Sequence, residues 1–460
     1  MRNSQNKLFQ FLSIILFTSG IGWLEYSGNR ANCTSVILPY VIVFLVYLWI
    51  LGSRPNALQI KQYLFFGFMV RLILLFSFPI LSDDIYRFCW DGFLLNQGIN
   101  PFMYTPSEIM QMKEFSDIHL GLSKIYPFLN SSEYHSVYPA FSQFIFAIAN
   151  RISGFDIAIF NVVLKLIFLL ADLIIVKSAL KLLKHFRLPK KNILLYFLNP
   201  LVILELNGNL HFEIWMIAFF AMSVSQLTDA RPLASALSLA LSVLSKMVSA
   251  IVVPWYLIHQ RKTQIIKFIL AFCLIMAIQT LMIPWTNAGT SGFLLYFQKF
   301  EFNSSIYILL REYFHSKEWW ITEQYTALIL KGLFALIAVC IWLYDIFHKS
   351  QTKFHFKSIW MLWFAYLCTS STIHPWYLTP LLFLGIFTFP LSSVVWSFLI
   401  FGSYIFYDDR VKEFFPYYVT IEYFILTLVF LYELNIQQRT NSISLKKMQT
   451  PKIIIPESAR

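Results

Sequence analysis

Long runs of apolar residues set the strongest limit on how this chain folds. The runs long enough or nearly long enough to cross a bilayer lie at about 8–24, 36–52, 63–81, 156–177, 211–227, 264–283, 323–345, 357–373 and 416–434. Only 13% of the 460 residues are charged, and the mean hydropathy is +0.62. In lipid, only helices and closed barrels satisfy their own backbone hydrogen bonds. The sequence therefore predicts an all-α polytopic membrane protein and excludes an ordinary soluble enzyme or a disordered chain.

Shorter apolar runs indicate that some helices do not cross the membrane alone. They lie at 192–204, 233–245, 247–258, 377–390 and 391–406. Because each is bounded by Asn, Pro, Ser or charge, we expect half-helices packed inside the bundle. The chain then has about 13–15 membrane segments, the first of them an uncleaved N-terminal helix. Residues 1–436 form the predicted membrane domain, and 437–460 form a basic, loosely ordered cytoplasmic tail.

The distribution of Lys and Arg predicts which side of the membrane each loop faces. With the N-terminus inside, the inner loops hold 22 of the 36 basic residues, the outer loops hold 10, and four lie within apolar runs. This bias is the positive-inside pattern of multi-pass proteins. We therefore expect both termini on the cytoplasmic side of the cytoplasmic membrane. The net charge of +12 then reflects topology, and no nucleic-acid partner is expected.

This topology places one long loop, residues 82–138, outside the cytoplasm. Long loops are usually functional. Apolar residues recur in it every three to four positions, at Ile109, Met112, Phe115, Ile118, Leu122 and Ile125. This spacing predicts an amphipathic helix on the membrane surface. A second outer segment, 284–323, is expected along the same interface.

The loop begins with a dense group of charged residues. Asp83 and Asp84 are adjacent, and a helix over 84–96 would place Asp84, Arg87 and Asp91 on one face, with Ser82 as its N-cap. One interpretation is purely structural, with acidic residues capping the helix and Arg87 pairing with its neighbours. The sharper hypothesis is a carboxylate that acts as general base at the membrane rim.

Two further polar groups interrupt apolar runs on the same predicted side. The first, LELNGNLHFEIW, carries Glu205, His211 and Glu213, which is more than a turn requires. The second, STIHPWYLTP, carries His374 beside aromatic residues that are also typical of a membrane interface. We expect these side chains to contribute to a substrate site.

Besides Lys331, four ionic residues lie inside apolar runs, where charge is costly. They are Arg71, Lys165, Asp172 and Lys246, the last at a break between two short helices. One alternative is ion pairing within the bundle, for instance between Arg71 and Asp172. The other, which we favour for Arg71, is binding of a lipid-linked phosphate, because intramembrane ions are generally functional.

The order of several motifs resembles that of bacterial GT-C glycosyltransferases, with the mannosyltransferase-like branch closest. The motifs are SDDIYRFCWDG, GINPF, VYPAF, NGNLHFE and HPWYL, and the resemblance runs from about residue 60 to 385. It implies an inverting transferase that takes a sugar, mannose in this branch, from a polyprenyl-phosphate donor at the outer face. His211 and Glu213 stand where the branch often has His followed by Asn-Asp, so Phe212 and Glu213 are departures.

The resemblance also assigns roles to the candidate residues. It implies that Asp83 or Asp84 is the catalytic base, without settling which. The expected substrate-binding residues are Arg71, Arg87, Asp91, Glu205, His211, Glu213, Lys246 and His374. The expected partners are the lipid-linked donor, a glycan or lipid acceptor and the membrane lipids. No cofactor is evidently required, and a role for a divalent cation stays open. The alternatives are a lipid or saccharide flippase and an envelope polymerase or ligase.

Overall fold

The chain folds as an all-helical protein, as predicted. The computed structural model describes residues 2–53, 55–259, 262–282, 301–317, 323–347, 355–388 and 390–449. Within these ranges no strand forms, and a single parallel bridge joins Phe302 to Thr372. The helices up to the end of the long loop are α1 (Arg2–Ser27), α2 (Cys33–Gly52), α3 (Ala57–Ile73), α4 (Asp84–Asn96), α5 (Pro106–Gln111), α6 (Ser116–Leu122) and α7 (Ala140–Ser153).

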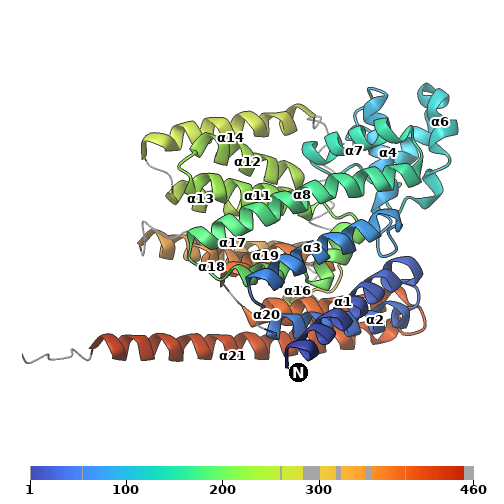
Figure 1. Cartoon of the computed structure of the whole chain (residues 1–460). Helices are drawn as coiled ribbons and strands as arrows, with labels where there is room; N and C mark the ends of the chain where they lie inside the picture. Colours follow the sequence, from blue (N-terminus) through green and yellow to red (C-terminus); the bar gives the residue numbers. More distant parts are fainter. Residues whose placement is uncertain are drawn as a thin grey trace, which may run out of the picture.

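The remaining helices form most of the bundle. They are α8 (Ile157–His185), α9 (Leu194–Phe197), α10 (Pro200–Val202), a π-helix η5 (Ile203–Gly208), α11 (Glu213–Thr228), α12 (Pro232–Ser245), η6 (Met247–Val252), α13 (Val253–His259), α14 (Lys262–Met282), α16 (Ile306–Ser316), α17 (Glu323–Phe347), α18 (Phe356–Cys368), η7 (Pro375–Leu378), α19 (Thr379–Thr388), α20 (Leu391–Leu399), η8 (Ile400–Tyr407) and α21 (Phe415–Gln449). In Figure 1, α4, α6 and α7 gather at one end of α8, and α14, α12 and α13 lie toward its other end.

Six helices in the described part of the chain are long and apolar enough to cross a membrane. They are Cys33–Gly52, Ala57–Phe76, Ile157–His185, Gln264–Met282, Tyr325–Phe347 and Lys412–Ile436. A seventh span results if Pro200–Gly208 and Glu213–Thr228, which are bent by 111° at their break, count as one. Of five shorter apolar helices, four coincide with runs predicted to be half-helices, and the fifth, Phe356–Cys368, is shorter than the run predicted at 357–373. The total of 13–15 crossings stays a prediction.

Helix α4 has the bounds that the sequence predicts, and it organises the long loop. It runs from Asp84 to Asn96, but its N-cap is Asp83 and not the predicted Ser82, although the Ser82 hydroxyl accepts a hydrogen bond from the Asp84 amide. The Arg87 guanidinium binds Asp91 and donates to the carbonyls of Ser131 and Tyr134. These bonds fasten the end of the loop to its first helix.

The amphipathic helix predicted within the loop does not form as one element. The segment is divided into α5, a short 3-10 helix at Lys113–Phe115, and α6. Ile109 and Leu122 are buried against Trp90 and Leu94 of α4. Periodic apolar residues such as Ile109 and Leu122 therefore pack in a small protein core and do not lie on a bilayer surface.

Two other predicted segments are partly described. The second outer segment contains α16, and most of the rest of 284–323 lies outside the described residues. Helix α21 continues to Gln449, so the tail predicted from residue 437 is helical over much of its length. The order of the tail and its cytoplasmic side stay predictions.

The ionic residues of the apolar runs are paired inside the bundle. Arg71 Nε lies 3.0 Å from Asp172 Oδ2, and neither side chain is exposed. The Arg71 guanidinium also stacks over Phe197, and Asn207 donates to Asp172. Lys165 donates to the carbonyls of Leu74 and Ser77, which lie where α3 ends. This geometry corresponds to the structural alternative for Arg71 rather than to the favoured phosphate-binding role.

The Arg71–Asp172 pair predicts a double-mutant result. Arg71→Leu should lower the stability of the purified protein by about 3–5 kcal/mol, because it leaves Asp172 buried without its cation. Arg71→Leu combined with Asp172→Leu should recover much of that loss. Thermal unfolding in detergent measures both effects. Arg71→Leu that melts like the wild type would contradict the structural assignment.

Candidate active site

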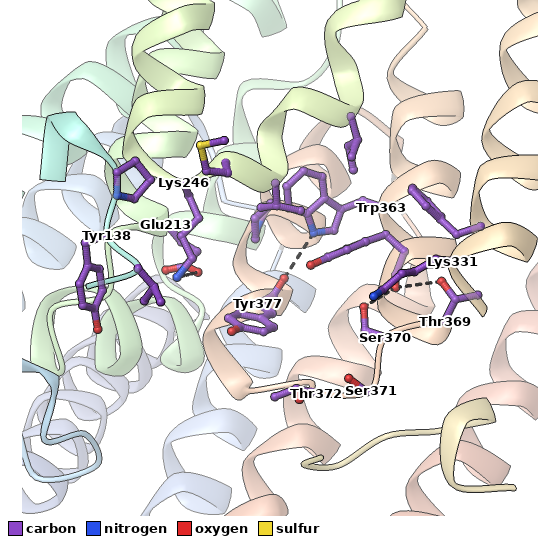
Figure 2. A pocket seen from close by; sticks show the side chains of 18 of the residues that line it. Tyr138, Glu213, Lys246, Lys331, Trp363, Thr369, Ser370, Ser371, Thr372 and Tyr377 are labelled. Carbon is purple, nitrogen blue, oxygen red and sulfur yellow. Dashed lines mark hydrogen bonds and ion pairs between the residues drawn. The ribbon is translucent and has the colours of Figure 1, made fainter. Parts of the chain in front are cut away.

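A cavity of about 490 Å³ lies where the long loop meets α11, η6, α17 and α18. Figure 2 shows its walls: Tyr138, Glu213 and Lys246 lie at one end, and Lys331, Thr369 and Ser370 lie at the other. Trp363 and Tyr377 lie between these ends. A cavity with mostly apolar walls, aromatic rings and a few polar groups is the usual form of a ligand site.

Glu213 and Lys246 form an ion pair in the cavity wall. Lys246 Nζ lies 3.0 Å from Glu213 Oε1, and the Glu213 side chain is 2% exposed. Lys246 occupies the break between α12 and η6, as predicted, and Glu213 is the first residue of α11. Lys246 also lies over the ring of Tyr377. The ends of two helices thus place both charges at the same end of the cavity.

Asp84 lies beside this end of the cavity. The polar side chains of Asn130 and Tyr138 interact with its carboxylate and favour the ionised form, and Tyr138 also lines the cavity. Burial raises the pKa of Asp84 above its usual range, and the positive charge of Lys246 opposes this rise. A carboxylate with a raised pKa is a better proton acceptor than an ordinary exposed Asp.

Asp83 has a different environment, although it is adjacent in sequence. Its carboxylate forms an ion pair with Arg30, from the turn between α1 and α2, and about a third of the side chain is exposed. Arg30 in turn lies over the ring of Tyr407. This pairing links Asp83 to the neighbouring loops rather than to the cavity.

The predicted histidines come together in an aromatic stack. The His211 ring lies 3.6 Å from that of Trp376, which lies 4.4 Å from His374 on its other face. His211 Nε2 is 3.4 Å from Glu205 Oε2, and Tyr404 donates to the same carboxylate. Burial, assisted by the charge of Lys246, lowers the pKa of His374 to about 3. His374 is therefore neutral near neutral pH.

The structure separates the predicted site residues into three groups. Asp84, Glu213 and Lys246 meet at the cavity. Glu205, His211 and His374 form the stack beside it. The others are engaged in structural contacts: Arg71, Arg87 and Asp91 in buried ones, and Asp83 in the partly exposed ion pair with Arg30.

Several cavity residues were absent from the sequence-based set. Tyr138 and Tyr377 belong to the VYPAF and HPWYL motifs, so the signal was available without an assigned role. Lys331 lies within a predicted membrane run, where its charge was the only signal. No group of three or more His, Cys, Asp or Glu side chains suited to a metal occurs among the described residues.

Comparison with known proteins identifies the family. The family described as alpha-(1->6)-mannopyranosyltransferase, N-terminal domain, matches residues 11–260. Alpha-(1->6)-mannopyranosyltransferase A of Mycobacterium tuberculosis is 22% identical over 272 residues, which are 57% of this chain and 50% of that protein. The chain thus matches about half the length of this curated relative, and no solved structure matches.

The matched region contains the acidic pair, the π-helix break and both members of the Glu213–Lys246 pair, and it ends before α17 and α18. Because it covers more than half of the chain, the protein belongs to the alpha-(1->6)-mannopyranosyltransferase family.

Proposed function

We propose that this protein transfers a mannosyl residue from a polyprenyl-phosphate donor to an acceptor hydroxyl at the outer face of the cytoplasmic membrane. The family supports a mannosyltransferase. The observation that carries the proposal is the position of Asp84, half-buried beside the cavity, where its carboxylate interacts with Lys246 and Tyr138 of the cavity wall. The charge distribution of the loops supports the outer face.

The chemistry needs one base and one stabilised leaving group. Asp84 accepts the proton of the acceptor hydroxyl as its oxygen attacks the anomeric carbon. The bond from that carbon to the phosphate oxygen breaks, and the lipid phosphate leaves with the electron pair. Attack from the face opposite the phosphate inverts the anomeric configuration.

Lys246 is the predicted cation best placed to stabilise the departing phosphate, because it lines the cavity. His374 is neutral, and Arg71 is buried against Asp172.

The flippase alternative relied on Arg71, Lys165 and Asp172 lining a pathway. Their buried pairing within the bundle removes that support. A divalent cation requirement stays open and is tested by chelation.

The two carboxylates of the acidic pair should behave differently. Asp84→Asn should lower mannose transfer by about 10²-fold or more, the scale for a lost general base. Asp83→Asn should stay within a few-fold of the wild type, because it removes only a partly exposed ion pair. Turnover is measured with a polyprenyl-phosphate mannose and a synthetic alkyl mannoside.

Thermal unfolding is the control for this comparison. Burial raises the Asp84 pKa, so the ionised form destabilises the folded state above the ordinary Asp pKa. Asp84→Asn should therefore melt no lower than the wild type. An active Asp84→Asn enzyme, or equal losses in both variants, would overturn the assignment of the base.

Lys246 should control the pH at which activity is lost. The base works when ionised, so kcat/KM falls as the pH drops through the Asp84 pKa. Lys246→Gln removes a charge that lowers this pKa and should move the acidic limb to higher pH. Lys246→Arg keeps the charge and should leave the limb near its wild-type position. A limb unmoved in Lys246→Gln would show that another group controls it.

The topology is tested by labelling single cysteines in intact cells. The five native cysteines are first replaced. Ser123→Cys, exposed in the long loop, should react with an impermeant maleimide, whereas Lys190→Cys, exposed in a predicted inner loop, should react only after the membrane is opened. The reverse pattern would place the cavity on the cytoplasmic side.

A further inference from the structure

The segment that delivers the acidic pair is held by one side chain from the break before α11. Asn209 follows the π-helix Ile203–Gly208 and is 1% exposed. Its carboxamide oxygen accepts hydrogen bonds from the backbone amides of Ile80 at 3.1 Å and Leu81 at 2.8 Å. Two adjacent amides, which no helix satisfies here, are thus bonded to the same oxygen atom.

The other end of the carboxamide is anchored to its own segment. The Asn209 amide donates to the Leu204 carbonyl at 2.9 Å and approaches Glu25 Oε1 at 3.5 Å. A Cβ at Gly208 would lie 2.1 Å from that Glu25 oxygen, so only glycine permits this close approach. The orientation of the Asn209 side chain is therefore fixed by groups on both sides.

Asn209 joins two segments, and each of them carries a different residue of the candidate site. Leu81 directly precedes Ser82, whose hydroxyl accepts from the Asp84 amide at the start of α4. On its own segment, Asn209 lies four residues before Glu213, which pairs with Lys246 in the cavity wall. This side chain thus joins the backbone that precedes Asp84 to the segment that precedes Glu213.

A neighbouring asparagine provides an internal comparison. Asn207 lies two residues away and is also buried, but its amide donates to Asp172 at 2.7 Å. It therefore serves the Arg71–Asp172 ion pair and not the acidic segment. The two asparagines of one NGN sequence bond to different parts of the molecule.

We propose that Asn209 is a positioning residue for sugar transfer, fixing the backbone at Ile80 and Leu81 so that Asp84 keeps its place beside the cavity. The inference rests on the proposed function, in which Asp84 is the base. A displacement of about 1 Å in a reacting group can cost about 10²-fold in rate. Loss of Asn209 should therefore lower kcat more than it changes the KM for the donor.

The test compares Asn209→Ala with Asn207→Ala, since each removes one buried carboxamide. Amide hydrogen exchange of peptides covering residues 78–90, measured on the full-length protein in detergent, should be at least 10-fold faster in Asn209→Ala and unchanged in Asn207→Ala. The Asn209 variant should lose about 10- to 100-fold in kcat with a nearly unchanged donor KM. The Asn207 variant should show mainly a lower melting temperature.

Each arm of this test can fail separately. Wild-type exchange at Ile80 and Leu81 in Asn209→Ala, or equal kcat losses in both variants, would overturn the positioning role. If Asn209→Ala does not accumulate in the membrane, Asn209→Ser, whose oxygen lies one bond closer to the backbone than the carboxamide oxygen, should show the same faster exchange; wild-type protection in that variant would also overturn the role. A wild-type protein that transfers no mannose would overturn the proposed function, while the exchange comparison would still test the contact.

Discussion

Breaks in the membrane helices form the candidate site, and each break requires buried side chains that satisfy its backbone. Burying a backbone amide or carbonyl without a hydrogen-bond partner costs several kcal/mol of free energy, and lipid offers no partner for it. Where α3 ends, Lys165 and Asn161 donate hydrogen bonds to the buried carbonyls of Leu74 and Ser77. The Asn209 side chain accepts hydrogen bonds from the backbone amides of Ile80 and Leu81, which follow in the chain. The polar residues of the apolar runs therefore make an irregular backbone possible at this depth.

The same requirement explains why the chemistry gathers on one side of the bundle. The broken pair formed by the π-helix and α11 turns by 111°, and Glu213 emerges directly after it. The break between α12 and η6 exposes Lys246 to the same cavity. The start of α4 contributes Asp84 from a third break. Three interruptions in otherwise apolar helices thus converge on one cavity.

The sequence alone predicted the structure correctly where residues close together in the chain determine it. The bounds of α4 followed from the spacing of its charged residues, and the break at Lys246 followed from two short apolar runs. The interior position of Lys165 and Asp172 followed from their separation of seven on one helix. These features depend on residues near one another in the chain.

The sequence alone did not predict features that depend on contacts between segments far apart in the chain. Periodicity cannot distinguish an apolar face that meets lipid from one that meets α4, so the surface helix at Ile109–Ile125 was predicted wrongly. Arg71 and Asp172 are 101 positions apart, and the sequence analysis favoured a phosphate ligand for Arg71 over this pairing. The distinction between Asp83 and Asp84 depends on Arg30 and Tyr138, which only the fold brings to them.

The most direct test of the account is a density map of the protein with a non-hydrolysable polyprenyl-phosphate mannose analogue bound. The account predicts the sugar in the cavity between Tyr138 and Tyr377, with its anomeric carbon facing the Asp84 side and the phosphate within reach of Lys246. A sugar bound outside this cavity, or one whose anomeric carbon is separated from Asp84 by the Glu205–His211 stack, would contradict it.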